Sequence, residues 1–286
     1  GVSDANAVIR ASHLCDELGI DTISSGATIA WAMECFEQGV LTSEDTGGLD
    51  LRFGEENAVM ESLRLISRRE GIGEILSIGS RAAAEVVGQG SEKWAMQVKG
   101  LEMPGYEPRS LKTMALGLAV STRGACHNRS SAYEADFSVA VNRLSVDEQR
   151  GRVTMDGEDF SSVLDSLIWC KFLRKAFDDF YAESSIIYEH VTGLTMGPDE
   201  LRIAGERINN LKKLFNIREG WMRHDDGLPR RVLEESLAGG IVDGVGLTRD
   251  DLDMMIESYY HVRGWTSDGM VPESNIDRLD LHDLIS

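Results

Sequence analysis

Hydrophobic side chains recur every three or four residues along much of the chain, which is the spacing of one face of an α-helix. In the first third, this pattern predicts helices over residues 5–18, 23–36, 55–67 and 72–87. Gly19 follows the first of them, and glycine readily takes the left-handed conformation that ends a helix. No stretch alternates with period two for long enough to predict a strand equally clearly. The first third is therefore expected to be helical.

The pattern changes over residues 97–109, which hold two of the chain's five prolines. Proline restricts its own backbone and that of the preceding residue, so this segment is expected to be extended or turning. Residues 130–155 are the least regular. Helical spacing is found in the remaining segments, at 110–121, 158–182, 199–214, 231–238 and 248–262, and a short apolar run spans 279–285. We expect a mainly α protein with two multihelical domains, residues 1–98 and 99–286.

Length and composition add limits to this picture. The 286 residues, 42% of them hydrophobic, are enough for a core of native size in one large or two ordinary domains. No apolar run approaches the roughly 20 residues of a membrane-spanning helix. The chain begins at Gly1 without a charged and then apolar leader, and we expect that it was excised from a longer protein.

The net charge limits the expected binding partners, and the cysteine spacing indicates the cellular compartment. A net charge of −19 would repel nucleic acid and anionic membranes, so neither is an expected partner. Solubility or a salty habitat is the expected reason for such acidity. Cys15, Cys35, Cys126 and Cys170 lie far apart and show no CxxC spacing. A disulfide framework is therefore not expected, and a reducing cytoplasm is the expected compartment.

Two stretches share a layout that hydrophobic burial does not explain. Asp16-Glu-Leu-Gly-Ile-Asp-Thr22 ends one predicted helix at a glycine and places Asp21 near the start of the next. Asp165-Ser-Leu-Ile-Trp-Cys-Lys-Phe172 places an acid, a cysteine and a lysine in an apolar run. One carboxylate can accept two N–H hydrogen bonds at once, which suits the amidine-like edge of a pterin or purine. We interpret the pair as two halves of one cofactor site.

Each motif also has a purely structural explanation. Asp21 can be simply the N-cap of the following helix, without any ligand. Cys170 can be a small buried hydrophobe. On an ideal helix Asp165 and Cys170 would lie about 140° apart, so the helix must end between them if both serve one site. His127 can exchange protons near neutral pH or be an ordinary surface residue. A pair with the adjacent Cys126 is not expected, because neighbours in an extended loop point in opposite directions.

Several segments, taken in order, carry a specific resemblance over almost the whole chain. They are Cys15–Gly26, Arg69–Gly73, Lys99–Glu102, Tyr106–Arg109, Ser121–Gly124 with His127, Asp165–Phe172, Gly205–Ile208, Phe215–Gly220, Leu228-Pro229 and Arg263-Gly-Trp265. Together they resemble the C-terminal part of the aldehyde:ferredoxin oxidoreductase family, which are tungsten or molybdenum bis-pterin enzymes. The expected fold is that of the family's two C-terminal, multihelical domains.

The resemblance also implies roles for individual residues. It implies that one pterin is bound by Asp16, Ile20, Asp21 and Thr22, and the second by Asp165, Trp169, Cys170 and Lys171, with Asn128 and Arg129 as further contacts. It implies that Cys170 is the fourth thiolate of a [4Fe–4S] cluster and that His127 is the active-site residue that transfers a proton. The implied enzyme oxidises an aldehyde to a carboxylic acid and passes electrons through the cluster to ferredoxin or a similar carrier.

The sequence departs from the family pattern in three ways. Ile168-Trp169 replaces a Gly-Leu pair, and isoleucine does not take a left-handed turn cheaply, so we expect a differently shaped turn or a differently seated cofactor. The family's other three cluster cysteines, its N-terminal β domain and an active-site glutamate lie upstream of Gly1, so this fragment alone is expected to be inactive and to hold neither cofactor. Arg10-Ala-Ser-His13 lacks the glutamate of a Glu-x-x-His pair, so mononuclear iron is not expected.

Two other functions stay open at this point. One is an aromatic acyl-CoA reductase subunit of the same family, and no residue separates it from the aldehyde-oxidising enzyme. The other is a cofactor-free helical scaffold that has lost the chemistry. The missing N-terminal half and the altered Ile168-Trp169 pair suggest it. The substrate, the choice of tungsten or molybdenum, the electron acceptor and a homo-oligomer are also left open.

Overall fold

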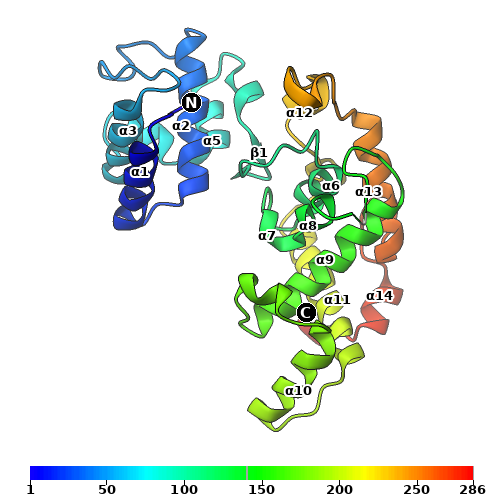
Figure 1. Ribbon diagram of the computed structural model, residues 1–286. Coiled ribbons are helices and arrows are strands. Elements are labelled where there is room, and N and C mark those ends of the chain that lie inside the picture. The colour runs from blue at the N-terminus through cyan, green and yellow to red at the C-terminus, as the bar shows by residue number, and fades with distance from the viewer. Residues whose placement is uncertain (140, 286) are drawn as a thin grey trace. The chain divides into compact units, whose positions relative to one another are not determined.

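The computed structural model describes residues 1–139 and 141–285, and helices dominate it (Figure 1). Strands in this part of the chain are limited to a short antiparallel pair, β1 (Gln97–Val98) and β2 (Leu101–Glu102). The predicted mainly α class is confirmed. The chain forms two compact units, one of Gly1–Tyr106 with Leu228–Glu235 and one of Glu107–Gly227 with the chain from Ser236 onward. Each unit is described by itself below.

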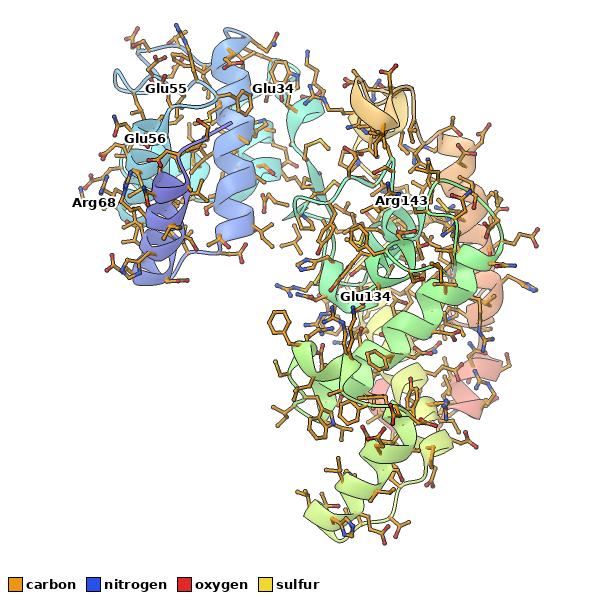
Figure 2. All side chains as sticks on the ribbon, in the orientation of Figure 1. Glu34, Glu55, Glu56, Arg68, Glu134 and Arg143 are labelled. Carbon is orange, nitrogen blue, oxygen red and sulfur yellow. The ribbon has the colours of Figure 1, made fainter. Side chains whose placement is uncertain are left out.

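The first unit packs its helices around an apolar core that includes the ring of Trp31, which is 1% exposed. The Trp31 indole Nε1 donates to the Ser91 carbonyl over 3.0 Å, so the buried polar atom is satisfied. Glu34 of α2, labelled in Figure 2, forms a bidentate ion pair with Arg231 of α12. The unit contains α1 (Ala5–Leu18), α2 (Thr22–Glu37), α3 (Glu56–Arg68), α4 (Ile72–Leu76), α5 (Gly79–Val87), η1 (Ser91–Trp94), the β pair and α12 (Arg230–Glu234).

The helix predicted over residues 72–87 is two helices, α4 and α5. The break falls between Leu76 and Gly79, and Gly79, the first residue of α5, has a φ of 82°, outside the range of helical residues. Just after the break, Ser80 donates its main-chain N–H over 2.7 Å and its hydroxyl over 2.9 Å to the buried carboxylate of Glu102. Helical spacing continues across this break, which is why the sequence pattern did not reveal it.

The second unit is organised around α9 (Gln149–Ser166), which packs against α11 (Pro198–Arg218) and α13 (Arg249–Arg263) (Figure 1). The remaining elements are α6 (Lys112–Val120), α7 (His127–Ser130), α8 (Tyr133–Asp136), η2 (Lys171–Lys175), α10 (Phe180–Thr192), η3 (Arg223–Asp225), η4 (Gly240–Val242), α14 (Glu273–Arg278) and α15 (His282–Ile285). In the described residues of both units, no helix is long and apolar enough to cross a membrane.

Helix α9 contradicts two sequence predictions. Residues 149–155 are helical although the pattern there is irregular, because α9 is buried through small and polar residues. At Gly151 a Cβ would lie 2.5 Å from the Tyr259 main-chain N of α13, so only glycine allows this approach. The buried Arg263 of α13 is paired with Glu158 over 2.8 Å. The helix predicted over 158–182 is also wrong, because α9 ends at Ser166.

Candidate paired-turn site

The two motifs fold into the same backbone structure, a helix that ends in a left-handed turn and is followed at once by another helix. In the first unit the Gly19 N–H donates to the Asp16 carbonyl over 3.3 Å, and the Ile20 N–H donates to the Cys15 carbonyl over 2.9 Å. This pair of bonds is a Schellman motif, which satisfies carbonyls at a helix end. The shared layout of the two stretches therefore has a structural cause.

In the first unit this turn presents two carboxylates. Asp16 is exposed, and within the described residues no hydrogen bond or ion pair engages its carboxylate. Asp21 is the N-cap of α2, where its Oδ2 accepts from the Ser24 N–H over 2.7 Å. The capping explanation of Asp21 is thus correct, yet its second oxygen stays available to a ligand. Ile20 and Thr22, the other predicted contacts, lie on either side of Asp21 in the same turn.

The second unit repeats the turn with isoleucine in the position of glycine. The Ile168 N–H donates to the Asp165 carbonyl over 3.2 Å, and the Trp169 N–H donates to the Leu164 carbonyl over 3.0 Å. Ile168 has a φ of 61°. The expectation of a differently shaped turn is therefore wrong, and the alternative expectation, a differently seated cofactor, stays a prediction. The left-handed conformation is kept at a steric cost, and the Ile168 side chain, 90% exposed, gains no burial in return.

Among the predicted second-unit residues, Arg129 and Lys171 approach the Asp165 carboxylate, and the Asn128 main chain contacts Lys171. One predicted side chain is an exception. Arg129 Nη1 donates to Asp165 Oδ2 over 2.8 Å, and Lys171 Nζ lies 3.8 Å from Asp165 Oδ1. Lys171 Nζ also donates to the Asn128 carbonyl over 2.5 Å. The exception is Trp169, whose ring packs edge-on against Phe177, 5.2 Å between centroids, in the apolar cluster of this unit.

Positive charge exceeds negative charge in this region. A cavity of about 530 Å³ is lined by Arg123, Arg129 and Lys212, among others. Burial lowers the pKa of Lys212, the charge of Arg129 lowers it further, and the Asp165 carboxylate opposes both. A basic cavity in a chain of net charge −19 favours an anionic ligand such as a phosphate group. Lys212 was not predicted from the sequence, because it lies 41 positions from Lys171 and belongs to none of the recognised motifs.

His127 is the first residue of α7 and is half-buried. Burial lowers its pKa below the usual 6.5, and the charge of Lys171 lowers it further. The ring lies 6.1 Å from that of Tyr133, between centroids. The imidazole is therefore kept neutral near pH 7, which is the form that can accept a proton.

Cys170 is exposed, whereas Cys15, Cys35 and Cys126 are buried. The explanation of Cys170 as a small buried hydrophobe is therefore wrong. It caps η2 after the left-handed turn, so the helix does end between Asp165 and Cys170. A [4Fe–4S] cluster takes four ligands, usually thiolates, and this chain offers one accessible thiol. The donor set fits a single cluster ligand and does not fit a whole cluster.

The family model described as "Aldehyde ferredoxin oxidoreductase, domains 2 & 3" matches residues 1–281. The chain belongs to this family. It is 33% identical over 290 residues to a tungsten-containing aldehyde ferredoxin oxidoreductase of Pyrococcus furiosus, a match that covers 98% of this chain and 46% of that protein. It is 30% identical over 293 residues to the aliphatic sulfonate oxidoreductase, WOR-like subunit, of the same organism, covering 98% and 43%.

A solved structure has the same fold. It is the active-site complex BamBC of benzoyl coenzyme A reductase with 1,5-dienoyl-CoA, with a TM-score of 0.79 and 21% identity, covering 99% of this chain and 47% of that one. At that identity the likeness shows the fold alone. The chain thus spans under half the length of the curated relatives that it matches. The predicted family and fold, two C-terminal domains of the aldehyde ferredoxin oxidoreductases, are confirmed.

The family implies a tungsten-pterin cofactor and an iron–sulfur cluster. The side chains fit the pterin, because the Asp16 carboxylate, which has no partner in the part of the chain that the structure describes, can accept from the N–H edge of a pterin. The basic cavity beside Asp165 fits the pterin phosphates. The fit to the cluster is limited to one ligand, Cys170.

Proposed function

We propose that this chain is the pterin-binding helical part of an oxidoreductase that oxidises an aldehyde to a carboxylic acid. Electrons would leave through a [4Fe–4S] cluster to ferredoxin or a similar carrier. The observation that carries the proposal is the repeated turn, with Asp16 and Asp21 on one copy and Asp165 and Cys170 on the other. Membership of an oxidoreductase family supports it.

Each copy of the turn holds one pterin in this proposal. Asp16 and the unused oxygen of Asp21 accept from the first pterin, with Ile20 and Thr22 beside them. At the second copy Asp165 is fixed by Arg129 over 2.8 Å and is approached by Lys171. These cations, with the main chain of Asn128 and Trp169, hold the second pterin. When bound, the tungsten- or molybdenum-pterin supplies the two-electron oxidation.

In this proposal His127 accepts the proton that aldehyde oxidation releases. Aldehyde oxidation adds an oxygen derived from water, so a proton must leave as the new C–O bond forms. A neutral imidazole can accept that proton, and burial together with the Lys171 charge keeps His127 neutral. Cys170, exposed at the end of the second turn, supplies one thiolate to the cluster.

The test is metal analysis of anaerobically purified protein. The sample is this chain together with the further region that its relatives contain. The proposal predicts about one tungsten or molybdenum and about four irons per protein. Arg129→Gln should lower the tungsten or molybdenum content, because Asp165 and the basic cavity lose a cation. The matched control is Arg152→Gln, an exposed arginine of α9 that pairs with Asp156 over 3.1 Å. A protein without either metal would instead support the cofactor-free scaffold.

A further inference from the structure

Helix α14 and the first residue of α15 bring three metal-ligand side chains together in the second unit (α14 is labelled in Figure 1). Glu273, Asp277 and His282 each offer one ligand atom, and these atoms all lie within 4.8 Å of one another. His282 Nε2 lies 2.8 Å from Asp277 Oδ1 and 3.8 Å from Glu273 Oε1. None of the three belongs to the paired-turn site.

Local structure explains why these side chains meet. Glu273 and Asp277 are four positions apart on α14, so they lie on the same face of the helix. The chain then turns back, and the Leu281 N–H donates to the Ile276 carbonyl over 3.1 Å. Leu281 is fully buried. Its burial places the next residue, His282, beside the face that carries the two carboxylates.

The backbone that carries the three side chains is tied to helix α11. Arg278, at the end of α14, donates from Nη1 to Glu206 Oε2 over 3.0 Å. Arg207 Nη2 donates to the Asp280 carbonyl, in the turn before His282, over 3.2 Å. A ligand set on a fixed backbone loses little freedom when it binds an ion.

The two carboxylates have no basic partner other than the histidine. Within the described residues no lysine or arginine pairs with Glu273 or Asp277, whereas the nearby Glu206 is paired with Arg278. The side chains of Glu273, Asp277 and His282 are 73%, 66% and 51% exposed, so an ion from solvent can reach them. This cluster therefore combines accessible negative charge with a nitrogen ligand.

We propose that Glu273, Asp277 and His282 bind one divalent first-row transition metal ion of the zinc type. Imidazole together with carboxylate suits such ions, whereas magnesium and calcium take oxygen ligands. Zinc bonds to nitrogen and oxygen of about 2.0–2.2 Å place tetrahedral ligand atoms roughly 3.3 Å apart. The separations of 2.8 and 3.8 Å lie on either side of that value. Three side chains leave the fourth position to water.

The bound ion would join the start of α15 to α14 and so fix the end of the second unit. This role is independent of pterin binding and of the proposed oxidoreductase activity. It also differs from an ordinary ion pair between His282 and Asp277, because the ion requires Glu273 as well.

The test is calorimetric titration of the 286-residue chain with Zn²⁺ in a buffer that does not chelate metals. The parent protein carries Cys170→Ser, because an exposed thiol is itself a zinc ligand. Zinc should bind with saturation at one equivalent. His282→Gln, Asp277→Asn and Glu273→Gln should each weaken binding by more than the roughly tenfold that loss of an outer-shell partner costs. An excess of Mg²⁺ should not displace zinc.

The matched control is His13→Gln. His13 Nε2 lies 3.4 Å from Glu17 Oε1 on α1, and both side chains are exposed, but this pair lacks a third ligand. Its replacement should leave zinc binding unchanged. Equal losses in His13→Gln and His282→Gln would overturn the proposal, because zinc would then bind surface histidines without selection. Unchanged binding in Glu273→Gln, or displacement of zinc by Mg²⁺, would overturn it as well.

Thermal unfolding gives a second measurement on the same proteins. An ion that binds only the folded chain raises its unfolding temperature. Zinc should therefore raise the unfolding temperature of the parent and of His13→Gln, and should not raise that of His282→Gln. A zinc-dependent increase of the same size in His282→Gln would overturn the assignment.

Discussion

At the scale of the residue, Ile168 has a strained left-handed backbone that packing of its side chain does not offset. Its φ of 61° is unfavourable for a β-branched residue, and its side chain is 90% exposed. We expect Ile168→Gly to raise the free energy of unfolding by about 1 kcal/mol, because the strain is relieved while little burial is lost. Chemical denaturation measures the change.

The matched control for that substitution is Phe172→Gly. Phe172 is also 90% exposed and lies four positions further on, but its backbone is not left-handed. This variant should not stabilise the chain. Equal effects at the two positions would mean that exposure, rather than backbone strain, determines the stability change.

His127 and Lys171 form a second prediction at the same scale. Burial and the Lys171 charge both lower the pKa of His127. Removing a positive charge favours the protonated imidazole, so Lys171→Gln should raise that pKa toward 6.5 without restoring it fully, since burial remains. A proton NMR titration of the histidine ring signals measures it. An unchanged His127 curve would contradict the coupling.

At the scale of the element, periodicity located helices well where one face is apolar and failed where burial is polar. Residues 5–18 match α1 because its core-facing positions follow the helical period. Residues 149–155 of α9 were missed because they face the core with residues such as Gly151, Arg150 and Thr154. No periodic apolar signal exists there. The contacts that satisfy such residues, such as Arg150 with Asp136, join distant segments and cannot be read from spacing.

The same limits apply to the candidate site. The two motifs were visible because they repeat an acid, a turn and a second polar residue. The cations near Asp165 were harder to find from spacing, because Arg129 lies 36 positions away and Lys212 lies on another helix. Ile168 adopts a left-handed conformation that its β-branched side chain disfavours. A prediction from residue propensity therefore gave the wrong shape for this turn.

Packing of α9 on α13 gives a prediction at this scale. A Cβ at Gly151 would lie 2.5 Å from the Ser258 hydroxyl and from the Tyr259 main-chain N. Gly151→Ala should therefore lower the free energy of unfolding by about 2 kcal/mol, since the two helices must move apart. Gly26→Ala is the control, because nothing lies within 4 Å of its Cβ in α2. It should stabilise by about 0.5–1 kcal/mol, as alanine does within helices.

At the scale of the whole molecule, this chain spans 46% of a tungsten-containing relative and offers one accessible thiol. One thiolate cannot retain a cluster that takes four ligands. We therefore expect the 286-residue chain alone to hold neither iron nor tungsten in stoichiometric amount after anaerobic reconstitution and desalting. Iron and tungsten that stay bound in fixed ratio through desalting would contradict this expectation.

The cluster assignment of Cys170 is tested in a form of the protein that matches its relatives over their whole length. Cys170→Ser should lower the iron content and the cluster absorbance, because a hydroxyl replaces a thiolate ligand. Cys35→Ala is the control, since that cysteine is fully buried in the first unit and burial raises its pKa to about 12, which keeps the thiol protonated. Its replacement should leave the iron content unchanged. If both variants keep full iron and absorbance, Cys170 is not a ligand, and the strained turn that presents it needs another explanation.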